Sequence, residues 1–118
     1  MKIMKIKEYV VNDPVPNRNE MVKIINALIN AHKDLSDRIM NDFISGGPIS
    51  ASGRRLRVMT VKKMNDAISH YEEELKILTD DTHIIEKSDG EWRSYFNHVI
   101  DLATLAPNVF REIAVTFD

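Results

Sequence analysis

The chain has 118 residues, of which 43% are hydrophobic and 29% charged, a composition that fits one globular domain with a modest core. It contains no cysteine, which excludes disulfides and thiolate metal sites and favours a reducing compartment such as the cytoplasm. No apolar stretch is long enough to span a membrane, and the lysine-rich start MKIMKIKEYVV does not resemble a signal peptide.

The net charge of −2 is unevenly divided along the chain. Residues 1–63 hold twelve Lys and Arg against six Asp and Glu, whereas residues 64–118 hold four against twelve. This balance disfavours a nucleic-acid binder that is basic throughout, and the unlike halves allow copies of the chain to associate. We therefore expect a homo-oligomer. Because no stretch is apolar enough to span a bilayer, we also expect that the chain binds no membrane.

The first part of the chain predicts an arm rather than a long helix. Residues 3–11 mix β-branched residues with lysines and predict either a short strand or an extended arm. Residues 12–17 include two prolines and form a rigid turn that cannot continue a helix. We assign residues 1–16 to this arm.

A first long helix is expected over about residues 18–44. Asn17 and Glu20 have the spacing of a capping box. Behind them, side chains recur at intervals of three and four on one stripe: Met21, Ile25, Leu28, His32, Leu35, Ile39 and Phe43. The run Gly46-Gly47-Pro48 is expected to end this helix.

A second long helix is expected over about residues 54–79, after a short linker at 46–53. Its apolar residues follow the alternating three-four pattern of a bundle or coiled-coil seam: Val61, Met64, Ile68, Tyr71, Leu75 and Leu78. Residues 55–58 also alternate like a strand, so a helix beginning only near residue 60 is an alternative. Residues 17–79 therefore predict an antiparallel helical hairpin.

The last third predicts a further helix behind a polar connector at residues 79–88. Ser88 and Glu91 form a second capping box, and the helix over about 89–106 carries Trp92, Tyr95 and Phe96, so we expect it to anchor the core. Pro107 interrupts it, and 108–114 are expected to add a final helical turn. The predicted fold is all-α and a single domain over 1–118, with 80–118 as its C-terminal helical segment.

Five cations lie at the expected start of the second helix, a group that we call the basic cluster: Arg54, Arg55, Arg57, Lys62 and Lys63. The start of a helix is already positive, so this order opposes the helix dipole. Free backbone N–H groups and arginine forks at that place can hold phosphate. The alternatives are a solvated face, or pairing with acidic residues of a neighbouring subunit.

Tyr9 is a second candidate for ligand contact. It is expected to be exposed on the arm beside Lys5 and Lys7, where the ring can stack on a base while the cations hold phosphate. The alternative is that Tyr9 folds onto the hairpin as a hydrophobic lid.

No pattern of reactive residues predicts catalysis. The four histidines have no ligand-like spacing, and His32 falls on the apolar stripe, as an interior histidine does. Ser50 and Ser52 lie in a loop without a partnering base, and the acidic run Glu72–Glu74 is either a solvated face or a partner-recognition surface. We expect no enzyme, no metal and no cofactor.

Part of the chain resembles a known family. Tyr9 and Pro14-Val15-Pro16-Asn17-Arg18-Asn19-Glu20 precede a long helix, and the run from Arg55 to Ile68, with Lys63–Ile68 inside it, follows the linker. Over about residues 9–70 this resembles the helical hairpin of small phage anti-defence proteins, the cyclic-nucleotide sponges that blunt CBASS and Thoeris signalling. The resemblance implies a homo-oligomer in the host cytoplasm that binds a cyclic nucleotide without chemistry, with Tyr9 and Arg55 at the ligand.

Three functions remain open from the sequence. The first is a non-enzymatic binder of a small phosphorylated ligand, with Tyr9, Arg54, Arg55, Arg57 and Lys63 as its contacts. The second is a helical interaction or inhibitor protein of phage or mobile-element origin that docks on a host protein. The third, a small DNA-associated regulator, is weakened by the acidic balance and by the lack of helix-turn-helix spacing.

Overall fold

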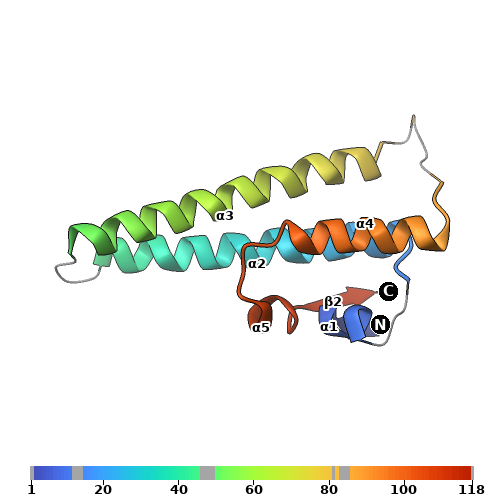
Figure 1. Ribbon diagram of the computed structural model, residues 1–118, viewed down its shortest axis with the longest axis horizontal. Coiled ribbons are helices and arrows are strands. Elements are labelled where there is room, and N and C mark those ends of the chain that lie inside the picture. The colour runs from blue at the N-terminus through green and yellow to red at the C-terminus, as the bar shows by residue number, and fades with distance from the viewer. Residues whose placement is uncertain (1, 12–14, 46–49, 81, 83–85, 118) are drawn as a thin grey trace.

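The computed structural model describes residues 2–11, 15–45, 50–80, 82 and 86–117. In chain order the elements are β1 (Lys2–Lys5), α1 (Ile6–Val11), α2 (Arg18–Ser45), α3 (Ala51–Leu78), α4 (Asp89–Asp101), α5 (Pro107–Phe110) and β2 (Ala114–Phe117) (Figure 1). The expectation of a mainly helical protein is confirmed. Among the described residues, no helix is both long and apolar enough to cross a bilayer.

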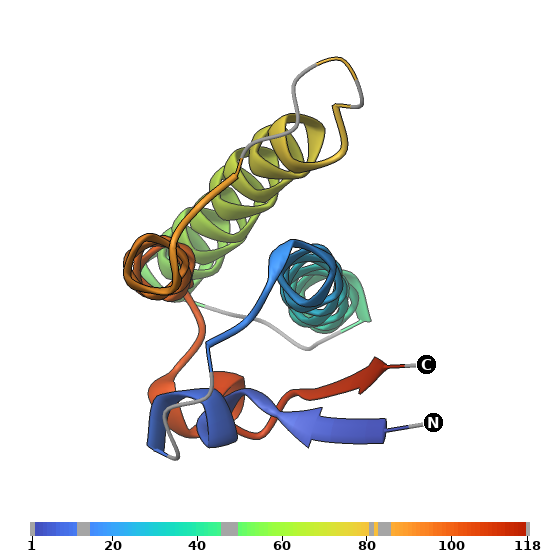
Figure 2. The ribbon, with the colours of Figure 1, turned by 90° about the vertical axis from the view of Figure 1, so that its right-hand side faces the viewer.

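Helices α2 and α3 lie side by side along the longest dimension of the molecule, which measures 52 × 31 × 24 Å (Figures 1 and 2). The Asn17 side chain accepts from the backbone N–H of Glu20 at 2.9 Å, as the predicted capping box requires. Ser50 caps α3 by accepting from the Gly53 N–H at 3.1 Å. Residues 54–60 are helical, so the strand alternative is wrong; the predicted stop at Gly46–Pro48 lies outside the described residues.

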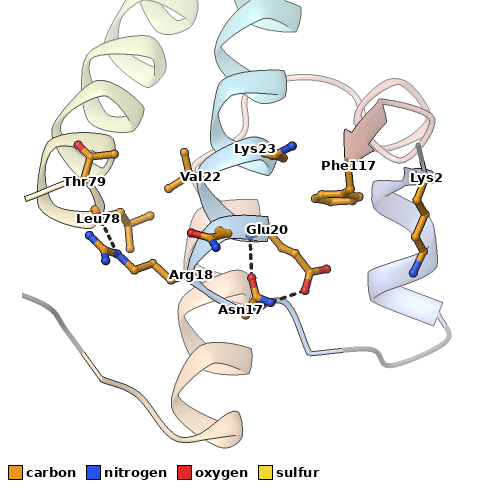
Figure 3. Close-up of a pocket in the computed structure, with 10 residues that line it drawn as sticks. Lys2, Asn17, Arg18, Glu20, Val22, Lys23, Leu78, Thr79 and Phe117 are labelled. Atoms are coloured by element: carbon orange, nitrogen blue, oxygen red, sulfur yellow. Dashed lines mark hydrogen bonds between the residues drawn. The ribbon is translucent and has the colours of Figure 1, made fainter. Parts of the chain in front are cut away.

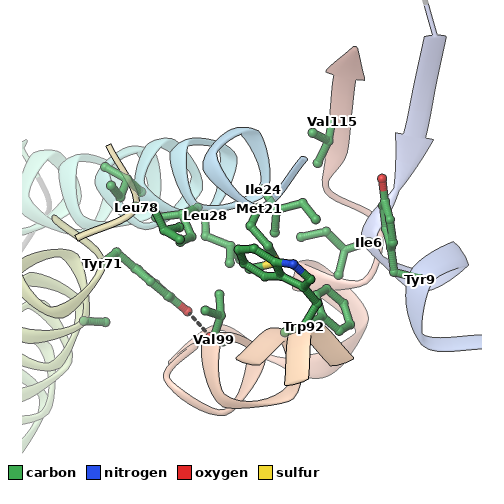
Figure 4. Close-up of a cluster of buried hydrophobic side chains, with 14 of the residues drawn as sticks. Ile6, Tyr9, Met21, Ile24, Leu28, Tyr71, Leu78, Trp92, Val99 and Val115 are labelled. Atoms are coloured by element: carbon green, nitrogen blue, oxygen red, sulfur yellow. Dashed lines mark hydrogen bonds between the residues drawn. The ribbon is translucent and has the colours of Figure 1, made fainter. Parts of the chain in front are cut away.

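The buried core occupies only the end of the molecule where α4 lies against α2 and α3 (Figures 1 and 4). Trp92, Phe96 and Val99 of α4 are buried, as expected for the anchoring helix. Among described side chains, those of α2 are no longer buried beyond Ser36, and those of α3 are not buried before Met64. Residues 37–45 and 51–63 therefore form a two-helix extension beyond the core, which we call the distal arm.

The predicted seam of α3 is used inside the chain. Met64, Ile68, Tyr71 and Leu78 are buried, and the Tyr71 hydroxyl donates to the Val99 carbonyl of α4 at 2.9 Å. The regular spacing is explained by packing of α3 within one chain, so it is not evidence that copies of the chain associate. The homo-oligomer stays a prediction.

Helix α4 ends at Asp101, five residues before the expected end at 106. A longer helix would bond the Thr104 N–H to the Ile100 carbonyl, but this N–H donates to Nε2 of His32 at 3.1 Å. The Ile100 carbonyl instead accepts from Ala103 at 3.0 Å. The hydrogen bond between Thr104 and His32 of α2 therefore determines where α4 ends.

The two ends of the chain pair as a small antiparallel sheet, in which Lys2 lies opposite Phe117 and Lys5 opposite Ala114 (Figure 2). The expected N-terminal strand is present, but α1 follows it in place of an extended arm. The final helical turn expected within 108–114 is present as α5, but it ends at Phe110, and β2 begins at Ala114. Alternate residues of β2, Val115 and Phe117, are buried against α2, which is why a strand forms there.

Candidate functional site

The basic cluster lies on the first turns of α3, on the distal arm. Arg54, Arg55, Lys62 and Lys63 are exposed, and Arg57 is half-buried. The first acidic residue of the helix is Asp66, about four turns after its start. The positive end of the α3 dipole and the cations therefore add to the same local field.

These cations are not neutralised by the described part of the chain. None of the five has a carboxylate of a described residue within 4.0 Å. Nη1 of Arg57 is buried and has no hydrogen-bond partner among those residues. A buried N–H without an acceptor is unfavourable for the fold, and because this atom is shielded from solvent it is not itself open to a ligand.

Exposed apolar side chains lie among the cations. On α3, Leu56, Val58 and Met59 are 67%, 59% and 52% exposed, and Met40 of α2 is 41% exposed on the same arm. Exposed apolar residues are ordinary singly, but a group of them beside charges is typical of an interaction surface. The cluster therefore offers both charge and apolar area.

Tyr9 is not part of this surface, and the expectation that it is exposed is wrong. Its ring is fully buried against Phe96 and Phe117 at centroid distances of 5.8 and 6.4 Å, and its hydroxyl donates to Glu20 at 2.8 Å. Burial and the Glu20 carboxylate both raise the pKa of Tyr9. It lies at the opposite end of the molecule from the start of α3, as the alternative of a hydrophobic lid describes (Figures 1 and 4).

The lysines that flank Tyr9 in the sequence have partners in the fold. Lys5 and Lys7 contact the two oxygens of the Glu112 carboxylate at 2.7 and 2.9 Å. Hydrogen bonds from both lysines lower the pKa of Glu112 to about 2. These cations hold the chain ends together and are not placed for phosphate beside Tyr9.

A cleft that was not anticipated lies around the start of α2, with a volume of about 810 Å³ (Figure 3). Lys2, Arg18 and Lys23 line it together with apolar Leu78 and Phe117. The Nε of Arg18 donates to the Leu78 carbonyl at 2.6 Å, and Lys23 lies over the Phe117 ring at 5.8 Å. Since these two cations already have structural contacts, the cleft is a weaker anion site than the basic cluster.

The remaining candidate residues have mainly structural roles. His32 is fully buried and contacts the Leu28 carbonyl at 2.6 Å through Nδ1, so it is an interior histidine as expected. Within the acidic run, Glu72 and Glu73 are exposed, but Glu74 accepts from the Tyr95 hydroxyl at 2.6 Å. The described residues contain no group of three or more potential metal ligands.

The site thus has cationic and apolar groups suited to holding an anion. Of the predicted ligand contacts, Arg54, Arg55, Arg57 and Lys63 lie together on α3, and Tyr9 lies apart from them. Comparison of the chain with protein-family models, characterised proteins and solved structures found no significant match.

Proposed function

We propose that this chain is a non-enzymatic binding protein that holds a small phosphorylated ligand at the basic cluster. In this proposal α2 and α3 act as an antiparallel hairpin, α4 is its third helix, and the distal arm presents the site. The observation that carries the proposal is the uncompensated positive charge on the first turns of α3, where five cations have no acidic partner among the described residues.

The side chains of the basic cluster suit a ligand with several anionic oxygens, such as a phosphate. Arginine presents two parallel N–H groups that match two phosphate oxygens, and Arg54, Arg55 and Arg57 supply three such forks within one helical turn. Leu56 offers exposed apolar area against which a base can pack.

The first ligands to test are cyclic di- and trinucleotides, the class that the resemblance of residues 9–70 implies. Stacking on Tyr9 is not retained in the proposal, because that ring is buried. Lys63 is kept as a phosphate contact on the same helix.

Calorimetry of the wild type and of Arg55→Ala against these nucleotides tests the proposal. The variant should bind about 1–3 kcal/mol more weakly, the usual range for a lost charge-assisted hydrogen bond. Its melting temperature should hold or rise slightly, because a cation leaves the positive end of a helix. Lys76→Ala, an exposed cation in the last turn of α3, is the matched control and should change binding little.

The proposal fails if no nucleotide in the panel releases heat and Arg55→Ala also melts at a lower temperature. That pair of results would mean that Arg55 stabilises the fold or an assembly. Mass spectrometry of the denatured protein, searching for a co-purified nucleotide, extends the panel to ligands that were not chosen in advance.

A second candidate is an interaction or inhibitor protein that docks the distal arm on another protein. It is supported by the apolar residues exposed among the cations, above all Leu56 at 67% and Val58 at 59%. Val58→Ser should then abolish capture of a protein partner while leaving the heat of nucleotide binding unchanged.

A further inference from the structure

The outer face of α3, turned away from α2 and α4, carries one continuous stripe of exposed residues. Lys62 and Glu73 are eleven residues apart, about three helical turns, and Met59 and Ile77 are eighteen apart, about five turns. Each pair therefore lies on one side of the helix, and Asp66 lies between them. Met59 is 52% and Ile77 is 50% exposed, and the three charged residues are exposed as well.

No described element covers this stripe. The buried residues of α3 point the other way, where Met64, Ile68 and Tyr71 contribute to packing with α2 and α4. Figures 1 and 2 show α3 along the outside of the molecule, with α2 and α4 on one side of it only. The stripe is thus available along about five turns of helix.

The order of charges along the stripe is self-complementary when the helix is reversed. Lys62 precedes Asp66, and Glu73 follows it, with an apolar residue at each end. If two copies of α3 meet antiparallel, with the two-fold axis between residues 67 and 68, Lys62 of each copy lies opposite the partner's Glu73. The same register brings Met59 to within one residue of the level of the partner's Ile77, and Asp66 to within one residue of the level of the partner's His70. A parallel arrangement would instead place Lys62 on Lys62 and Glu73 on Glu73.

We propose that the outer face of α3 is a self-association surface, and that two copies of this chain pair through it, antiparallel, about a two-fold axis. Isologous pairing of this kind forms each contact twice, so the Lys62–Glu73 ion pair occurs at two places in one dimer. We assign a second copy of this chain as the partner because the order of charges along α3 is complementary to itself. Favourable ion pairs then form without any residue outside this helix.

This surface goes beyond the proposed ligand site. The paired segment runs from Met59 to Ile77 and so shares Lys62 and Lys63 with the basic cluster, whereas Arg54, Arg55 and Arg57 lie before it. Arg55→Ala should therefore weaken nucleotide binding and leave self-association unchanged. The two proposals can fail independently.

Sedimentation velocity over a range of micromolar concentrations tests the pairing. Lys62→Glu and Glu73→Lys each replace two attractive pairs by two repulsive ones, and each should raise the dimer dissociation constant about tenfold or more. The double variant, Lys62→Glu with Glu73→Lys, restores opposite charges and should dimerise like the wild type. An equimolar mixture of the two single variants should form heterodimers.

Lys33→Glu makes the same charge change at an exposed position of α2 and is the matched control; it should leave the dissociation constant unchanged. Thermal melts of each variant as a monomer show whether it folds. Salt raised from ~0.1 M to ~1 M should weaken the dimer, because the Debye length falls from ~10 Å to ~3 Å. A monomer at every concentration overturns the proposal, as does a double variant that dimerises no better than the single variants.

Discussion

At the scale of single residues, Tyr9 shows how one hydrogen bond changes a functional interpretation. An aromatic residue between lysines resembles a ligand contact in the sequence, but the ring lies in the core, and its hydroxyl donates to Glu20, which also belongs to the cap of α2. Tyr9 therefore joins α1 to the start of α2.

We predict that Tyr9→Phe lowers the free energy of unfolding by about 1–2 kcal/mol, because it removes a partly buried hydrogen bond to a carboxylate. Urea denaturation measures this change. In a Glu20→Gln background the same substitution should cost less, since the charged acceptor is gone. Nucleotide binding per folded molecule should be unaffected; a loss of binding without a loss of stability would return Tyr9 to the ligand site.

At the scale of elements, His32 connects three parts of the fold. Its Nδ1 contacts the Leu28 carbonyl of α2, its Nε2 accepts from Thr104 beyond α4, and its ring lies 5.5 Å from that of Tyr71 on α3. Accepting through Nε2 requires the neutral imidazole with its proton on Nδ1. Burial lowers the pKa of His32 and keeps it neutral.

This neutral histidine predicts a loss of stability in acid. Below the ordinary histidine pKa of about 6.5 the unfolded chain takes up a proton that the folded chain resists, so stability is present above that pH and falls as the pH drops toward the lowered folded pKa. The slope from one such group is at most about 1.4 kcal/mol per pH unit. Tyr71 stays neutral throughout, since burial raises its pKa.

Urea denaturation at several pH values between about 7 and about 5, a range that includes the ordinary histidine pKa, measures how the free energy of unfolding changes with pH. His32→Gln should unfold more easily at neutral pH and lack the histidine component of the pH dependence. His70→Gln, at an exposed position of α3, controls for the loss of a histidine side chain and should change the free energy of unfolding at neutral pH little. A slope unchanged by His32→Gln would contradict this role.

At the scale of the whole molecule, stability should be graded along α2 and α3. The buried side chains lie where α4 and the small sheet cover these helices, and the distal arm has only the two helices packed on each other. Segments with few buried contacts open at lower free energy than the core.

Hydrogen exchange read by mass spectrometry should therefore show faster exchange over residues 51–60 than over 65–78 of the same helix. A ligand at the basic cluster should slow exchange in the first segment, whereas self-association through α3 should slow it mainly from Met59 onward. Uniform protection along α3 in the isolated monomer would mean that the arm is as stable as the core.

The sequence alone predicted the helices α2, α3 and α4, the two capping boxes, the position of the basic cluster and the interior place of His32. These features depend on residues within about four positions of one another, or on a periodicity that repeats every turn. Even the start of α3, for which a strand remained an alternative, differs from the expectation by only three residues.

Only the tertiary structure decided the burial of Tyr9, the early end of α4, the use of the α3 seam inside the chain and the pairing of β1 with β2. Each depends on residues far apart in sequence: Tyr9 and Phe117 meet in the core, His32 takes the N–H of Thr104, and Lys2 lies opposite Phe117. The residues of each strand do not indicate which other segment the strand pairs with. A four-residue strand is stabilised by the neighbouring strand to which it is hydrogen-bonded and by the helix against which it packs.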